Sequence, residues 1–292
     1  MIDAGYRAYT RYSESAQMSR ALKNPPFVEA DLNYIVDDGK PSIRYVDWPE
    51  EEHKSHIPTY EARLTRIHDA RKSGEIFELS KQGFTLVTHP SAVSNFYDED
   101  EIRRVYYPEV QKLVESVTGA ARVVVFDHTV RTGLEARHAE GWIRDTVRYV
   151  HNDFTERSAP RRLRHALPER EAERALGGRY AIIQLWRSIA PRVESEPLAL
   201  CDGRTIPGVG FVRNERRYRE RTAETYHMTY NPAYRWYYFP LMSNDEAIVF
   251  KVFDSDANGG VRFTAHSAFD DPTSAPDAAV RESIEMRTFA FY

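Results

Sequence analysis

The second half of the chain is a succession of strand-like segments, and this feature constrains the fold more than any other. After Gly178, short runs rich in Val, Ile, Phe, Tyr and Trp follow one another at roughly ten-residue spacing, with turn-forming residues between them. The runs read R-Y-A-I-I-Q-L-W-R-S-I, P-L-A-L-C-D, Y-H-M-T-Y, Y-R-W-Y-Y-F-P, E-A-I-V-F-K-V-F-D, V-R-F-T-A-H-S-A-F and S-I-E-M-R-T-F-A-F-Y. Strands at this spacing predict a mainly β fold, a sandwich or jelly roll, and not an α/β sheet.

Helical patterns lie before this block and predict flanking helices. From Asp98 to Thr118, apolar residues recur at three- and four-residue steps, acidic residues occupy the first turn, and Gly119 follows as a C-cap. A second pattern, over residues 160–176, is interrupted by Pro168 and therefore predicts two short helices. Upstream, F-E-L-S-K-Q-G-F-T-L-V-T-H predicts two strands around Gly83.

No internal repeat or low-complexity linker marks a boundary between independent domains in these 292 residues. Residues 1–60 are largely polar and are broken by N-P-P and D-D-G-K-P, so we expect an N-terminal extension packed on the main body. Residues 61–292 are expected to form the main β-rich domain. The two parts are predicted to make one structural unit.

Composition limits the metal chemistry and the partners. Cys201 is the only cysteine, so the chain has no internal disulfide, and any metal must be held by His and carboxylate. The formal net charge is −4 and the arginines are scattered without a basic stripe, so nucleic acid is not an expected partner. No run approaches the ~18 consecutive apolar residues of a membrane span. The start of the chain has no signal-peptide pattern, so we expect a cytoplasmic protein without a membrane partner.

The stretch Y-V-H-N-D-F-T, residues 149–155, contains a candidate half-site for a metal. Side chains at i and i+2 of a strand point to the same face, so His151 and Asp153 are placed to reach one ion. The same spacing occurs often by chance, and a His beside an Asp is commonly only a hydrogen-bonded pair. A third ligand is therefore required.

The stretch T-A-H-S-A-F-D-D-P-T supplies that ligand in His266, on a strand that a jelly roll can return beside the first pair. His151, Asp153 and His266 would then form the two-histidine, one-carboxylate triad that leaves coordination positions open and suits Fe(II) activating O₂. The alternative is that His266 is a half-buried structural histidine. In that case His227 and His138 are the next candidates.

The stretch R-E-S places Arg281 and Ser283 on one face of a late strand. A guanidinium matches a carboxylate with two hydrogen bonds and a hydroxyl adds a further donor, so the pair is a candidate anchor for the distal carboxylate of a 2-oxo acid bound to the metal. The alternative is a weak surface ion pair between Arg281 and Glu282. The order H-x-D, distal His, R-x-S favours the iron site.

From about Arg63 to the C-terminus, the chain also resembles the iron- and 2-oxoglutarate-dependent oxygenases of natural-product pathways. That family includes the hydroxylase/desaturase of aspergillic acid biosynthesis and the small component of the cephamycin 7-methoxylase system. The similarity lies in G-F-T-L-V-T-H, Y-Y-P-E-V, F-D-H-T-V-R, V-H-N-D-F-T, L-W-R-S-I, P-L-A-L-C-D, R-W-Y-Y-F-P, F-K-V-F-D-S-D, A-H-S-A-F-D-D-P and R-E-S-I-E-M-R.

The resemblance implies a double-stranded β-helix in which His151, Asp153 and His266 bind Fe(II) and Arg281 with Ser283 anchors 2-oxoglutarate. It implies O₂-dependent hydroxylation, desaturation or oxidative cyclisation of a small amino-acid- or peptide-derived intermediate. Two positions depart from related sequences, which often read H-R-W-Y-Y-F and W-R-P. Tyr234 and Ser188 stand there in this chain and mark either a changed substrate pocket or nothing.

Candidate substrate-binding residues lie on two strands of the β-rich half. Arg187 is a candidate partner for a substrate carboxylate, and aromatic residues are candidate pocket walls: Trp186, Trp236, Tyr237 and Tyr238. Each is equally ordinary core or strand-surface material. Two rival functions stay open: a catalytically silent jelly-roll binding protein, and a cupin-type dioxygenase that uses no 2-oxoglutarate. Succinate release and the 2-oxoglutarate dependence of O₂ uptake discriminate among them.

Overall fold

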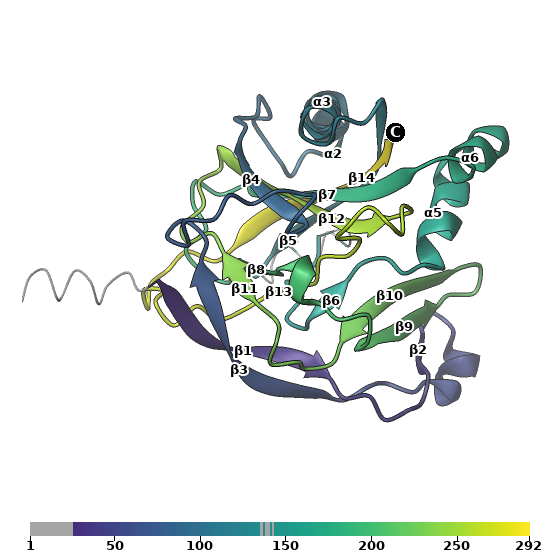
Figure 1. Ribbon diagram of the computed structural model, residues 1–292, viewed down its shortest axis with the longest axis horizontal. Coiled ribbons are helices and arrows are strands. Elements are labelled where there is room, and N and C mark those ends of the chain that lie inside the picture. Colours follow the sequence, from purple (N-terminus) through teal and green to yellow (C-terminus); the bar gives the residue numbers. More distant parts are fainter. Residues whose placement is uncertain (1–25, 135–136, 138–140, 142) are drawn as a thin grey trace, which may run out of the picture.

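Two β-sheets stacked face to face form the body of the computed structural model, which describes residues 26–134, 137, 141 and 143–292 (Figure 1). The nine-stranded sheet has the order β1 (Phe27–Ile35), β3 (Tyr60–Asp69), β11 (Trp236–Tyr238), β8 (Leu198–Cys201), β13 (His266–Ala268), β6 (His151–Asn152), β10 (Thr222–Met228), β9 (Phe211–Arg217) and β2 (Ser42–Tyr45). The five-stranded sheet has the order β4 (Phe84–Thr88), β12 (Glu246–Asp254), β7 (Tyr180–Ser188), β14 (Glu282–Phe291) and β5 (Arg122–Thr132). The predicted mainly β, two-layered fold is confirmed.

The main core lies between the two sheets. Alternate residues of each strand point to opposite faces, so Ile182 and Trp186 of β7 point inward and meet Leu200 of β8 and Tyr237 of β11. A second core fills the space between the outer face of the five-stranded sheet and a long helix. A third packs β1 against the outer face of β8 and β11. Strands such as β7 are therefore buried on both faces.

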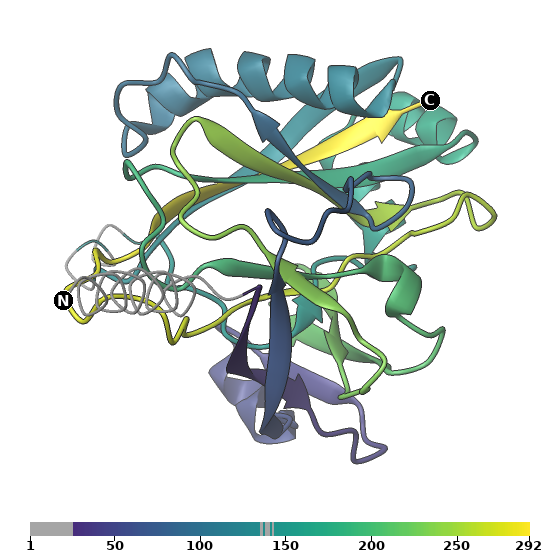
Figure 2. The same cartoon turned by 60° about the vertical axis from the view of Figure 1, so that its left-hand side comes forward.

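The long helix covers the five-stranded sheet, as Figures 1 and 2 show. It consists of α2 (Glu99–Glu101), the π-turn η2 (Ile102–Tyr106) and α3 (Tyr107–Thr118). Asp98 caps its start by accepting hydrogen bonds from two backbone N–H groups, and Gly119 ends it with a left-handed φ of 68°. These bounds confirm the prediction. The π-turn precedes Pro108, which has no N–H to donate to the carbonyl of Arg104.

The pattern interrupted by Pro168 does form two short helices, α5 (Ser158–Ala166) and α6 (Glu169–Leu176). The expectation of two strands around Gly83 is half wrong, because only β4 forms. Residues 79–82 make turns instead, and the N–H groups of Gln82 and Gly83 donate to the carbonyl of Glu78. Two 3₁₀ turns complete the helical elements: η1 (Pro49–Lys54) and η3 (Gly203–Thr205).

The N-terminal extension contributes strands to the sheet itself. β1 pairs antiparallel with β3, which begins at Tyr60, and β2 pairs parallel with β9 at the opposite edge. The division at residue 60 stays a prediction, and the nine-stranded sheet runs across it. Among the helices that the structure describes, none combines the length and the apolar character needed to cross a membrane.

Candidate metal centre

Two neighbouring strands of the nine-stranded sheet bring the predicted histidines together. β13 pairs antiparallel with β6, and His266 stands directly opposite His151, with ring centroids 4.3 Å apart. Asp153 follows β6, and its Oδ1 lies 3.3 Å from Nε2 of His151. One ligand atom from each of the three residues lies within 4.8 Å of the other two. The structure therefore assembles the predicted trio.

Hydrogen bonds on the far side of each ring orient the two histidines. Nδ1 of His151 lies 2.8 Å from the carbonyl of Tyr149, and Nδ1 of His266 lies 3.2 Å from that of Thr264. A proton on each Nδ1 leaves Nε2 with a lone pair directed at the centre. Nε2 of His266 is buried and has no hydrogen-bond partner. Burial also lowers the pKa of His266 to about 3, so the ring stays neutral, as a metal ligand must be.

Asp153 offers one oxygen to the centre, because the other is already bound. Its Oδ2 accepts hydrogen bonds from Nε2 of Gln184, at 2.5 Å, and from Nε of Arg287, at 3.3 Å. Burial opposes ionisation of Asp153, but the neighbouring Arg287 and His151 hold the pKa of the carboxyl well below its usual range. An imidazole nitrogen without a hydrogen-bond partner and a carboxylate with only one oxygen held by Gln184 and Arg287 fit a divalent metal ion.

Gln184 and Arg287 were missed by the sequence analysis, although a signal for Arg287 was present. The alternation that places Arg281 and Ser283 on one face of β14 continues to Glu285 and Arg287. Gln184 pairs with Arg287 across β7 and β14, so both reach Asp153 from the five-stranded sheet. No local sequence signal marks Gln184.

The reserve candidate His227 lies beside the trio but is not part of it. It stands opposite His151 in the pairing of β10 with β6, with ring centroids 6.4 Å apart. Its Nδ1 is 2.6 Å from the hydroxyl of Tyr60, and Nδ2 of Asn214 is 3.0 Å from its Nε2. Both nitrogens are therefore already engaged. The other reserve candidate, His138, lies outside the described residues.

Arg281 and Ser283 lie together on the inward face of the five-stranded sheet, and both are buried. Nη1 of Arg281 donates to the carbonyl of Glu196 at 2.7 Å, whereas its Nε and the Ser283 hydroxyl have no hydrogen-bond partner. Burial, assisted by the charge of Arg131, lowers the pKa of Arg281 to about 9, so the cation persists at neutral pH in a poorly solvated place. Two unused donors beside a buried cation are suited to a carboxylate.

Two of the five candidate substrate-binding residues, Trp186 and Tyr237, point between the sheets. The ring of Trp186 lies 5.5 Å from the guanidinium of Arg281. Arg187 is on the opposite face of β7, 5.4 Å from the ring of Tyr106 under the long helix. Trp236 and Tyr238 face the outer core of the nine-stranded sheet. Neighbouring residues of a strand point to opposite faces, so Arg187, Trp236 and Tyr238 lie away from the space between the sheets, and their role in substrate binding stays a prediction.

The two departures from related sequences lie in different places. Tyr234 stacks on Tyr34, with ring centroids 6.2 Å apart, beside the outer core. Ser188 stands opposite Ser283 in the pairing of β7 with β14, and its hydroxyl donates to the carbonyl of Ala190 at 2.8 Å. Ser188 therefore adjoins the candidate anchor, whereas Tyr234 is remote from it.

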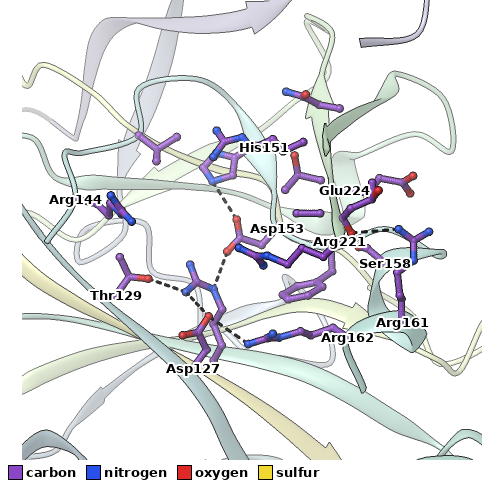
Figure 3. Close-up of a pocket in the computed structure, with 18 of the residues that line it drawn as sticks. Asp127, Thr129, Arg144, His151, Asp153, Ser158, Arg161, Arg162, Arg221 and Glu224 are labelled. Carbon is purple, nitrogen blue, oxygen red and sulfur yellow. Dashed lines mark hydrogen bonds and ion pairs between the residues drawn. The ribbon is translucent and has the colours of Figure 1, made fainter. Parts of the chain in front are cut away.

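A cavity of about 660 Å³ opens beside the ligands and is large enough for a small organic molecule (Figure 3). β5, β6, α5 and the hairpin of β9 and β10 supply its walls. Its acidic residues are Asp127, Asp145, Asp153 and Glu224. Its arginines are Arg131, Arg144, Arg161, Arg162, Arg216, Arg221 and Arg287. The lining therefore carries three more positive than negative formal charges, whereas the chain as a whole carries −4.

Comparisons with known proteins agree with this geometry. The profile of the family described as "Oxidoreductase/YMDC permease-like domain" matches residues 32–291. The alpha-ketoglutarate-dependent dioxygenase phiK of a fungal species is 30% identical, over 91% of this chain and 96% of the relative. The hydroxylase/desaturase efuI of Hormonema carpetanum is 32% identical, over 94% and 98%. A solved structure of the iron and alpha-ketoglutarate-dependent endoperoxidase NvfI superimposes with a TM-score of 0.82, at 27% identity over 91% of this chain and 98% of that one. The likeness confirms the predicted jelly roll.

Proposed function

This chain belongs to the Fe(II)- and 2-oxoglutarate-dependent dioxygenases, and on that premise we propose that His151, Asp153 and His266 bind the iron. The observation that carries the assignment is the buried Nε2 of His266, which has no hydrogen-bond partner and faces the other two ligand groups. A buried polar atom without a partner costs free energy unless something occupies its lone pair. A metal ion does so.

Arg281 and Ser283 hold the distal carboxylate of 2-oxoglutarate in this proposal. The free Nε of Arg281 and the free hydroxyl of Ser283 are the donors, and the guanidinium is already fixed by its bond to the Glu196 carbonyl. Trp186 lies against that guanidinium and excludes water from it. A preorganised, dry anchor of this kind strengthens charge-assisted hydrogen bonds.

Fe(II) bound with 2-oxoglutarate supplies the activation of O₂ that lets these enzymes oxidise unactivated carbon. The protein's part is to keep the ligand geometry fixed. Gln184 and Arg287 restrain Asp153 so that a single oxygen faces the centre, and the ring of Phe250 packs edge-on against His266 at 4.9 Å. His151 and Asp153 line the cavity that would hold the substrate.

The reaction proposed is hydroxylation, desaturation or oxidative cyclisation of a small amino-acid- or peptide-derived natural-product intermediate, in the cytoplasm. The names of the relatives support the reaction class, since they include a hydroxylase/desaturase and an endoperoxidase. The resemblance to enzymes of the aspergillic acid and cephamycin pathways supports the substrate class.

Succinate formation tests the proposal directly. Purified protein is given Fe(II), ascorbate and 2-oxoglutarate, and uncoupled release of succinate is expected even without the substrate. A catalytically silent binding protein would form none. A dioxygenase that uses no 2-oxo acid would consume O₂ equally well when 2-oxoglutarate is omitted.

A further inference from the structure

The excess positive charge of the cavity is divided between two places. One group of arginines lies beside the co-substrate anchor. Arg131 stands opposite Ser283 in the pairing of β5 with β14, and the backbone of Arg144 forms an isolated β-bridge with that of Arg131. These two cations and Arg281 are the natural surroundings of a 2-oxo acid with two carboxylates. The 2-oxo acid therefore accounts for the first group of arginines, and no anion is yet assigned to the second group.

The second group lies on the other wall of the cavity, where helix α5 meets the hairpin of β9 and β10. Nη1 of Arg161, on α5, donates to the hairpin carbonyl of Thr222 at 3.2 Å. Arg221, the neighbour of Thr222, points in Figure 3 from the hairpin in the direction of Asp153. Its guanidinium lies 4.4 Å from the ring of Tyr218. Two cations from different elements thus line this side of the cavity, Arg161 half-buried and Arg221 exposed.

The acidic residues of the cavity do not neutralise this pair. Asp127 lies 3.5 Å from Arg162 and 3.6 Å from Arg287. Asp153 is bound by Arg287, and Glu224 accepts a hydrogen bond from Thr155.

Among the residues that the structure describes, no carboxylate pairs with Arg161 or Arg221. The remaining acid, Asp145, adjoins Arg144 in the first group of arginines. A concave site lined by arginines without carboxylate partners has a positive potential that attracts anions.

We propose that the substrate carries a carboxylate, or an equivalent acidic group, that binds to Arg161 or to Arg221. The inference rests on the proposed function and narrows its substrate class to organic acids. An acid held at this wall directs the remainder of its carbon skeleton across the cavity to the open side of the metal ligands. Arg161 and Arg221 then determine which carbon is presented for oxidation.

Matched probes test the preference for an acid. The wild-type protein, loaded anaerobically with Fe(II) and saturating 2-oxoglutarate, is titrated with 1-naphthaleneacetate and separately with its uncharged methyl ester, and each Kd is measured by calorimetry. Saturating 2-oxoglutarate keeps the acid out of the anchor at Arg281. The acid is expected to bind roughly tenfold or more tightly than the ester. Equal binding of the two probes by the wild type overturns the proposal.

Variants assign the preference to the two arginines. The double substitution Arg161→Gln with Arg221→Gln should bring the ratio of the two Kd values close to one, and the corresponding double Lys variant should keep part of the preference. Arg164→Gln is the matched control, because Arg164 lies on the same helix and already pairs with Glu173 at 2.7 Å. An acid preference that persists in the double Gln variant refutes the assignment. If that variant does not fold, an undiminished preference in both single Gln variants refutes it equally.

The same preparations separate this inference from the proposed function. Succinate formation by the wild type is measured without either probe. If no succinate forms, the assignment as an oxygenase fails, while the ratio of acid to ester binding still reports on Arg161 and Arg221. If succinate forms but the acid is not preferred, only the substrate class is wrong.

Discussion

At the scale of single residues, the metal centre depends on which ring nitrogens are already hydrogen-bonded. His266 and His227 flank His151 on its two neighbouring strands and are both buried. Burial and the neighbouring His151 also lower the pKa of both rings. They differ in their free atoms, since only His266 keeps an unpartnered Nε2. The free Nε2 therefore favours His266 over His227 as the third candidate ligand.

Replacing His266 by Ala should remove iron binding, whereas replacing His227 by Ala should preserve it. The measurement is the visible charge-transfer band that Fe(II) and 2-oxoglutarate are expected to give together under anaerobic conditions. The band should vanish in His266→Ala and persist in His227→Ala, with near-UV circular dichroism confirming that both variants fold. The reverse pattern would show that the third ligand is misassigned.

Replacing Arg281 by Gln should raise the 2-oxoglutarate concentration needed for half-maximal uncoupled turnover by roughly one to two orders of magnitude. The reason is the loss of charge-assisted hydrogen bonds worth ~1.5–3 kcal/mol. Iron affinity should change little. Arg187→Gln is the control, because Arg187 lies on the opposite face of the sheet and should leave the 2-oxoglutarate requirement nearly unchanged. An effect of Arg187→Gln as large as that of Arg281→Gln would contradict the placement of the anchor.

At the scale of elements, sequence reasoning succeeded where a strand or helix has one distinctive face and failed where both faces are alike. Arg281 and Ser283 share a face because their spacing is two, and the helix that ends at Gly119 has a clear apolar stripe. β7 is buried along its whole length on both faces, so burial does not alternate along it. The sequence pattern therefore could not show which of Trp186 and Arg187 points between the sheets. The contact of Asp153 with Gln184 depends on how two sheets stack, which no local pattern encodes.

The turn before β4 ends at Gly83, which lies close against Thr264, two residues before β13. Gly83 has a φ of +93°, and a Cβ placed there would lie 2.2 Å from Oγ1 of Thr264. Gly74 has a similar φ of +70°, but a Cβ there would meet nothing within 4 Å. At both positions a residue with a Cβ would be strained by the positive φ, at a cost of ~1–2 kcal/mol. Only Gly83 adds a steric conflict, next to the strand that carries His266.

Gly83→Ala should therefore lower the free energy of unfolding by ~1–3 kcal/mol more than Gly74→Ala does, because overpacking adds to the backbone strain. Urea denaturation followed by tryptophan fluorescence measures both variants. An equal loss in the two would mean that Thr264 moves aside without cost.

At the scale of the whole molecule, the candidate metal centre connects the two sheets. The three candidate ligands belong to β6, β13 and the residue following β6, all on the side of the nine-stranded sheet. The restraints on Asp153 come from β7 and β14 of the five-stranded sheet. We therefore expect an ion bound here to stabilise the contact between the two layers as well as the ligands themselves.

Binding of a divalent ion should raise the thermal unfolding temperature of the protein. At an ion concentration a hundredfold above Kd the stabilisation is ~2.7 kcal/mol, or roughly 5–10 °C for a domain of this size. Differential scanning calorimetry with Mn(II), which resists oxidation, measures the shift, and EDTA should reverse it. His266→Ala should show no comparable shift. Equal shifts in the wild type and in His266→Ala would place the ion elsewhere.

The residues that hold Asp153 in place belong to different elements from those that carry Arg161 and Arg221. This separation bears on how such enzymes diverge. The residues that restrain Asp153 lie inside the stacked sheets, whereas Arg161 and Arg221 lie on a short helix and a hairpin turn that supply no candidate ligand. Substitutions in α5 or in the turn can accumulate over evolutionary time without disturbing the ligand geometry. A lineage can therefore acquire new metabolites by altering this helix and turn while inheriting its oxidative chemistry unchanged.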